Sequence, residues 1–413
     1  MNLIKTSFLS FSATIVKMLA GLAINKSVAI YIGPGGLALI GQFQNFIQMV
    51  MVVAQGGINA GVTKYTAEYA AENKSVASLL GTASKISISC SVVSGVLIIV
   101  FSDYISERFL KSVNYDYVIM IFGFTVILFV INNFFLSILN GLKEIRLFIT
   151  VNIIQSIYSL VFTTLLIIFL DIEGALIALV TNQSFVFLIL LWMLRKHSVI
   201  KLSIFKQIFD KVEARKLVGY SGMALTSAIA VPVSHLLVRE YIGDNISWTE
   251  AGYWQGVWYI SVMYLMVVTT TLNVYFLPRL SELSDRADLR NELVQGYKII
   301  MPLVVVASLL IYVLRDYIIW ILFSDEFTPM RDLFLWQLVG DVIKLASWML
   351  SYIMLAKAMT KEFILTEIVF SLSFVVLSVI CIDVYGLIGV TYAFAINYLI
   401  YLITVYSIVK KNI

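Results

Sequence analysis

Long apolar runs dominate this chain, and their length decides what it can fold into. About 20 consecutive apolar residues form a helix that crosses the ~30 Å hydrocarbon core of a bilayer. The sequence contains twelve such runs, separated by charged residues or by Gly and Pro: 8–32, 38–63, 79–101, 117–141, 147–170, 174–194, 219–242, 251–278, 297–323, 331–356, 361–382 and 386–409. Only 13% of the residues are charged, against about 25% in soluble proteins. We therefore predict an all-α, polytopic membrane protein with about twelve transmembrane helices.

Lysine and arginine predict the orientation of these spans. If the N-terminus is cytoplasmic, 21 of the 29 Lys and Arg residues lie in inside segments and 5 in outside segments. The other three, Lys17, Lys26 and Lys344, lie within spans. Cytoplasmic loops of membrane proteins carry an excess of Lys and Arg. The bias therefore predicts that both termini are cytoplasmic, as expected for a multi-pass protein of the bacterial inner membrane.

The longest polar stretch, 195–218, divides the chain into two sets of six spans. Leu202, Phe205, Phe209 and Val212 fall on one helical face of this stretch, which predicts an amphipathic linker on the inner membrane surface. We therefore expect an N-terminal six-helix lobe at 1–200, a cytoplasmic linker at 201–216 and a C-terminal six-helix lobe at 217–413. Parallel repeats of this kind are typical of transporters, whose substrate site lies near the membrane midplane.

Two lysines lie at informative depths in the first span. A charge at the bilayer centre costs about 2.5–3.5 kcal/mol, so such residues normally face a protected cavity. At 1.5 Å per residue, Lys17 lies ~13 Å from the cytoplasmic end of its span, close to mid-bilayer. Lys26 lies ~27 Å from that end, and its side chain can extend to the outer interface as an anchor. Lys17 is therefore the stronger candidate for a cavity residue.

A second pair of charges, Asp341 and Lys344, lies in the tenth span. Counted from outside, Asp341 is ~15 Å deep and Lys344 ~20 Å. Their i,i+3 spacing permits an ion pair, and Gln337 lies one turn before Asp341 on the same side. Two interpretations remain open. The pair holds helices together, or Lys344 binds an anionic ligand while Asp341 positions it or exchanges a proton.

Other ionisable residues of the second half have less certain roles. His235 can titrate near neutral pH, although a hydrogen bond between helices explains it equally well. Arg239 and Glu240 lie within a turn of the predicted outer end of their span, which favours anchoring at the interface. Glu367 is only ~9 Å from the inner end of its span and can reach the inner interface.

Amide side chains are unusually frequent in the second span. Gln44, Gln48, Gln55 and Asn59 recur at intervals of four and seven residues, which predicts one helical face. Hydrogen bonds between helices explain one or two such amides, whereas a longer stripe suits a water-filled cavity that meets sugar hydroxyls. The eighth span adds aromatic side chains that suit either sugar rings or a protein core: Tyr253, Trp254, Trp258 and Tyr259.

Several enzymatic chemistries lack their motifs. The chain has no G-x-x-x-x-G-K-[ST] phosphate loop and no Cys/His spacing typical of zinc. Cys90 and Cys381 both fall within apolar spans, which favours buried thiols over a disulfide. The first outside loop, at 32–36, carries no acidic residue, which weakens the case for a membrane-embedded glycosyltransferase or polymerase. We predict a transporter that needs no metal or cofactor.

Four stretches carry a family resemblance. Residues 33–37 and 56–65 (GPGGL and GGINAGVTKY), and residues 327–334 and 336–341 (FTPMRDLF and WQLVGD), resemble the Wzx family of lipid-linked oligosaccharide flippases. That family belongs to the polysaccharide-exporting branch of the superfamily that contains the MATE drug exporters. The resemblance implies two six-helix lobes around a central cavity that opens alternately to each side. It also implies an undecaprenyl-pyrophosphate-linked oligosaccharide as cargo, for O-antigen or enterobacterial common antigen.

The resemblance gives the intramembrane charges a purpose. An anionic pyrophosphate must cross the membrane, and Lys17, Lys64 and Lys344 are the residues expected to bind it, with Lys26 and the span-two amides as further candidates. The implied energy source is a proton or sodium gradient or the membrane potential. Candidates to carry the coupled ion are Asp341, Glu367 and His235. A polysaccharide polymerase and a chain-length regulator are implied as partners. A MATE-like drug antiporter remains the alternative.

Reporter fusions test the topology on which every depth depends. We expect fusions at Ile200 and Ser284 to report a cytoplasmic location and fusions at Asn114, Asn245 and Ser324 an external one, because the basic residues lie 21 to 5 in favour of that orientation. Alkaline phosphatase and green fluorescent protein, active on opposite sides of the membrane, provide the paired readouts. The opposite pattern would invert the chain.

Overall fold

The computed structural model describes residues 3–72, 74–195, 207–272, 276, 279–280, 283, 285–357 and 359–410. These residues form α-helices joined by turns and short 3-10 helices, and none of them lies in a strand. The predicted all-α class is therefore confirmed. In a bilayer this is the expected outcome, because a helix satisfies its own backbone hydrogen bonds where water is absent.

The first half of the chain contains α1 (Leu3–Tyr31), α2 (Gly33–Ala54), α3 (Asn59–Ala71), α4 (Ala77–Val100), α5 (Ser102–Leu110), η1 (Val113–Tyr115), α6 (Asp116–Gly141) and α7 (Ile145–Leu194). The 50-residue α7 is interrupted at Asp171, whose φ of 49° and ψ of −127° are not helical. The predicted spans 147–170 and 174–194 lie on either side of this break.

The second half contains α8 (Lys211–Asn245), α9 (Trp248–Thr271), α11 (Arg286–Val313), α12 (Arg315–Leu322), η4 (Asp325–Leu333), α13 (Phe334–Ala356), α14 (Thr360–Tyr385), η5 (Gly386–Ile388) and α15 (Gly389–Val409). Among the described residues, eight segments are long and apolar enough to cross a membrane, and two of them are 50 residues long. These segments cover ten of the predicted spans, and α8 and α9 coincide with the other two. The protein is a multi-pass membrane protein, and twelve spans stays a prediction.

Two of the predicted spans are not continuous helices. Span 38–63 breaks after Ala54 because Gly56 and Gly57 adopt φ of +66° and +63°, values that favour glycine. Span 297–323 breaks after Val313, where the Arg315 guanidinium donates a hydrogen bond to the Tyr312 carbonyl at 2.7 Å. An arginine bonded to the last carbonyls of a helix is a common way to end it.

The chain divides into two compact units, and the division runs through two continuous helices. Unit one contains residues 1–31 and 42–229, and unit two contains residues 32–41 and 230–413. The first nine residues of α2 thus belong to unit two, and the first half of α8 belongs to unit one. The predicted linker falls partly on residues 201–206, which lie outside the described residues, and partly on the start of α8. The predicted lobe boundaries therefore stay predictions.

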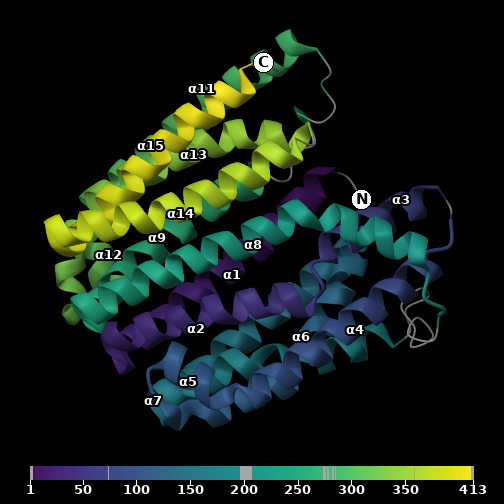
Figure 1. The fold of residues 1–413 in the computed structure, drawn as a ribbon, viewed down its shortest axis with the longest axis horizontal. Helices are drawn as coiled ribbons and strands as arrows, with labels where there is room; N and C mark the ends of the chain where they lie inside the picture. Colours follow the sequence, from purple (N-terminus) through teal and green to yellow (C-terminus); the bar gives the residue numbers. More distant parts are fainter. Residues whose placement is uncertain are drawn as a thin grey trace. The chain divides into compact units, whose positions relative to one another are not determined.

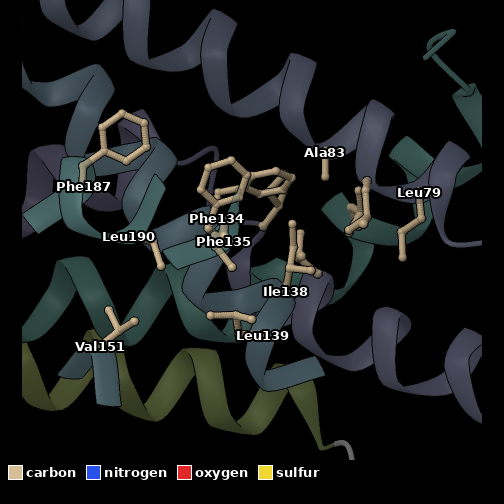
Figure 2. Packing of buried hydrophobic residues seen from close by; sticks show 14 residues of the cluster. Leu79, Ala83, Phe134, Phe135, Ile138, Leu139, Val151, Phe187 and Leu190 are labelled. Carbon is tan, nitrogen blue, oxygen red and sulfur yellow. The ribbon is translucent and has the colours of Figure 1, made fainter. Parts of the chain in front are cut away.

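Unit one has a core of aromatic and aliphatic side chains between its helices. Figure 1 shows α4 and α6 side by side, and α6 also packs against α7. Figure 2 shows the side chains at this junction, all of which are nearly inaccessible: Leu79 and Ala83 from α4, Phe134, Phe135, Ile138 and Leu139 from α6, and Val151, Phe187 and Leu190 from α7. Lipid is as apolar as these residues, so close packing rather than escape from water stabilises the cluster.

Polar contacts fix the start of α8 on unit one. The Tyr69 hydroxyl on α3 donates to the Glu213 carboxylate at 2.7 Å and accepts from the Lys216 ammonium at 2.7 Å. Hydrogen bonds to Tyr69 and Glu213 raise the pKa of Lys216, so this ammonium stays charged at physiological pH. Leu217, the next residue, is fully buried in the core cluster of Figure 2.

Unit two is built on close contacts between its helices. Figure 1 shows α13, α14 and α15 side by side, with α15 packed against both others. Small residues permit these approaches. A Cβ added to Gly340 of α13 would overlap the Phe394 ring of α15, and one added to Gly252 of α9 would overlap the Pro34 carbonyl of α2.

Gly252→Ala tests the contact between α9 and the start of α2. The added methyl group overlaps backbone rather than a flexible side chain, so the helices must separate, at a cost of about 1–3 kcal/mol. We expect a lower unfolding temperature in detergent. Gly219→Ala is the matched control, because the structure leaves open space at its Cβ and alanine favours a helix by up to about 1 kcal/mol over glycine. Equal unfolding temperatures for the two variants would contradict the contact.

Candidate functional site

Lys344 lies in a box of aromatic side chains inside unit two. Its side chain is 6% exposed. Its Nζ lies 4.5 Å from the ring centre of Trp258 and 4.7 Å from that of Trp348. The Phe394 and Tyr398 rings follow at 5.6 and 5.5 Å. Each such contact with a desolvated ammonium contributes up to about 2 kcal/mol, so the box can hold a charge that lipid would reject.

Helical spacing explains how the box forms. Trp348 follows Lys344 by four residues on α13, and Tyr398 follows Phe394 by four residues on α15. Residues four apart share one face of a helix, so two tightly packed helices supply three of the four rings. Trp258 on α9 supplies the fourth. The tenth predicted span thus presents its buried lysine to aromatic rings rather than to lipid.

Asp341 has partners of its own. It is fully buried and accepts hydrogen bonds from the Tyr264 hydroxyl at 3.1 Å and from Gln337 Nε2 at 3.5 Å. The Tyr264 hydroxyl also lies 3.3 Å from Ser308 Oγ. Asp341 and Lys344 do not form the direct ion pair that their spacing permits, since the described residues show none between them. The two charges still interact with each other, so both interpretations stay open.

His235 extends the aromatic box along α8. It is 6% exposed, and its ring centre lies 4.0 Å from that of Trp258 and 5.5 Å from the parallel ring of Trp254. Phe374 of α14 lies 5.5 Å from the same imidazole. Trp258 therefore contacts both His235 and Lys344. Of the other predicted ion carriers, Glu367 is half-buried on α14.

Arg239 is a buried residue that the sequence interpretation misplaced. It is 2% exposed, and its Nη2 donates a hydrogen bond to Gln255 Oε1. Its guanidinium carbon lies 5.7 Å from the Trp254 ring centre. Anchoring at the outer interface is therefore wrong for Arg239, and Glu240, 7% exposed, is buried too. One sequence signal pointed inward, because Arg239 follows His235 by four residues and so shares its face.

The predicted lysines of unit one are more accessible. Lys17 is exposed on α1, and Lys26 is half-buried on the same helix. Lys64 is exposed on α3, with its Nζ 4.8 Å from the Tyr65 ring centre. The structure thus brings His235, Asp341 and Lys344 together within unit two and places these three lysines in unit one.

The four predicted amides do not share a helical face. Gln44 and Gln48 are exposed on α2, but Gln55 follows the end of that helix and Asn59 begins α3. That prediction is wrong because of the turn at Gly56 and Gly57. Asn59 Nδ2 instead donates a hydrogen bond to Gln55 Oε1 at 2.6 Å, so these two amides brace the turn.

A cavity of about 640 Å³ lies elsewhere in unit two. The turns after α8 and α14 and the 3-10 helix η4 form it, and Glu250, Asp332 and Asp383 bring carboxylates to its walls. Tyr253, which the sequence offered as a candidate for contact with sugar rings, lines this cavity. The cavity's acidic walls would repel an anion.

Comparison with known proteins gives this geometry a context. A family model described as polysaccharide biosynthesis protein matches residues 3–284. A protein of Escherichia coli K12 named Lipid III flippase is 32% identical over 401 residues, which cover 97% of this chain and 96% of that protein. A Shigella flexneri protein of the same name matches equally well. The chain is thus similar to these flippases over nearly its whole length.

Solved structures show the same fold. The inward-facing conformation of a multidrug resistance MATE family transporter of the MOP superfamily has a TM-score of 0.80 at 14% identity, over 98% of this chain and 97% of that one. The inward closed conformation of the lipid II flippase MurJ has a TM-score of 0.73 at 16% identity, over 98% of this chain and 87% of that one. The predicted MATE-like fold is confirmed, and at these identities the likeness extends to the fold alone.

A double-mutant cycle tests the aromatic box. We expect Trp258→Leu to destabilise the protein more when Lys344 is present than in a Lys344→Met background, with a coupling of about 0.5–2 kcal/mol from the lost cation–π contact. Reversible unfolding in detergent provides the free energies. A parallel cycle of Asp341→Asn with Lys344→Met should give a smaller coupling. A larger value there would mean that an ion pair, not the box, stabilises Lys344.

Proposed function

This chain belongs to the polysaccharide biosynthesis protein family, and from that membership we propose that it is a flippase for a lipid-linked oligosaccharide. The observation that carries the proposal is the 32% identity with proteins named Lipid III flippase over 97% of the chain. A MATE-like fold supports a transporter rather than an enzyme. The cargo belongs to the class of undecaprenyl-pyrophosphate-linked repeat units used for enterobacterial common antigen or O-antigen.

The pyrophosphate is the part of such a cargo that cannot enter lipid unaided. Lys344 suits it, because no described group accepts a hydrogen bond from its Nζ, although the charges of Asp341 and Glu367 act on it. Its three N–H donors therefore remain for phosphate oxygens, while the aromatic rings stabilise the charge before the cargo arrives. Lys17 and Lys64, both exposed, are further candidates to bind the pyrophosphate. Alternating access then exposes the bound cargo to one side of the membrane and afterwards to the other.

We propose that the coupled ion binds close to Lys344, at Asp341. Asp341 receives hydrogen bonds from Tyr264 and Gln337, and binding of a proton would remove the negative charge nearest the lysine in sequence. The neutral Asp341 would no longer repel an anion bound at Lys344. Such interactions between charges are strong where water is scarce. Glu367 and His235 are the other proposed ion carriers.

The proposed setting is the inner membrane of a bacterium, with both termini in the cytoplasm and transport toward the periplasmic leaflet. A polysaccharide polymerase and a chain-length regulator are proposed as partners that receive the cargo. Among transporters of this fold, a drug antiporter is the alternative. Lys344 disfavours a cationic drug, because its buried ammonium would repel a second cation.

Complementation tests the proposed function. We expect the wild-type chain to restore surface glycan in a strain that lacks a Lipid III flippase or in one of a panel of strains lacking O-antigen flippases. Restoration of no glycan, at confirmed expression in the membrane, would overturn the proposal. Lipid-linked oligosaccharide that remains on the cytoplasmic side gives a direct second readout.

Variants in that strain test the lysines. Lys17→Ala and Lys344→Ala should each reduce export at least tenfold, because each removes a cation proposed to hold pyrophosphate, while the corresponding arginine variants retain part of the function. Lys361→Ala, at an exposed position at the start of α14, is the matched control and should export normally. Normal export by both alanine variants at equal abundance would remove these lysines from the mechanism.

A further inference from the structure

Arg239 presents buried hydrogen-bond donors that no protein group satisfies. Its Nη2 bonds to Gln255, but its Nε and Nη1 have no partner, and neither does Trp254 Nε1 on the neighbouring ring. Arg239 and Trp254 are 2% and 1% exposed. Buried donors without acceptors are strongly unfavourable, and more so when they carry charge. These atoms therefore call for an acceptor that the chain does not supply.

The missing acceptor should also carry negative charge. Among the described residues no carboxylate forms an ion pair with Arg239. The nearby core holds a second cation, since Trp258 contacts both His235, one turn before Arg239 on α8, and the Lys344 ammonium. Several described buried side chains have polar atoms that lack hydrogen-bond partners. Among them, Arg239 is the one that carries a permanent charge. A neutral water would satisfy the donors but would leave the charge.

The surroundings limit the size of this acceptor. Gln255 packs so closely on α2 that a Cβ added to Gly41 would lie 2.6 Å from its side chain. On the other side, the Trp254 and His235 rings are parallel, with centres 5.5 Å apart. These close contacts favour a small acceptor over one as large as a phosphate ester.

We propose that Arg239, with Trp254 Nε1 as a second donor, holds a small monovalent anion such as chloride inside unit two. The anion would neutralise the guanidinium where α8 meets α9 and so stabilise their packing. This site is separate from the pyrophosphate site proposed at Lys344. It does not depend on which cargo the protein carries.

Chloride dependence of unfolding tests the proposal. Purified full-length protein in detergent is heated in sodium chloride, sodium bromide or sodium gluconate at equal ionic strength, because gluconate is too large for the site. A ligand that binds only the folded state raises stability with its concentration. We expect a saturable rise in unfolding temperature with chloride and bromide relative to gluconate. Identical unfolding in chloride and gluconate would overturn the proposal and leave water as the acceptor.

Variants locate the effect. Gln255→Glu supplies a carboxylate to Arg239, so it should unfold in gluconate at the temperature that the wild type reaches in chloride, and it should lose the chloride response. Arg195→Gln is the matched control. It removes an exposed arginine that also lies over a tryptophan, 4.8 Å from the Trp192 ring centre, and it should keep the response. A chloride response that survives Gln255→Glu would place the ion elsewhere and overturn the assignment.

Diffraction from the wild-type protein decides the matter without variants. Crystals grown in bromide should show an anomalous peak within hydrogen-bond distance of the Arg239 guanidinium. No peak there, in protein whose unfolding responds to bromide, would also overturn the assignment.

Discussion

An ion in a membrane core must be stabilised by the protein around it, and this constraint shapes unit two. Placing one charge at mid-bilayer costs about 2.5–3.5 kcal/mol even on a lenient scale. The four rings around Lys344, at 4.5 to 5.6 Å, can each contribute up to about 2 kcal/mol when water is excluded. The rings therefore offset part of the cost of burying the ammonium.

The contact of Lys344 with aromatic rings rather than with a carboxylate matters for the proposed transport. A lysine paired with a carboxylate would have to break an ion pair before it could bind an anion. Aromatic rings hold the cation through their faces and leave its N–H donors unoccupied. Asp341, meanwhile, is satisfied by Tyr264 and Gln337. The arrangement keeps Lys344 and Asp341 close together in sequence but bonded to different groups, as the proposed ion-coupled binding of an anion would require.

The sequence predicted the helical class and most helix positions, because apolar length and basic loops are local signals. It also selected Lys344 and Asp341, whose depth requires no knowledge of neighbours. It did not predict their surroundings, since Trp258 and Phe394 reach Lys344 only through the packing of α9 and α15 on α13. Arg239 was misplaced because depth was counted from the end of a span, whereas burial depends on the facing helix. The prediction that four amides share one helical face was wrong for a local reason. The Gly56-Gly57 pair ends the helix, although the apolar pattern runs on through it.

Fold and cargo are separate questions for a protein of this fold. Drug exporters and a lipid II flippase match this chain at 14–16% identity with TM-scores of 0.80 and 0.73, so the architecture alone cannot select between cationic and anionic cargo. The buried side chains of unit two can favour one class of cargo over the other. Lys344 places a cation in the core of unit two, and the pyrophosphate site proposed there would attract an anion and disfavour a cationic drug. The flippase assignment thus receives independent support from chemistry, because family similarity and buried charge favour the same class of cargo.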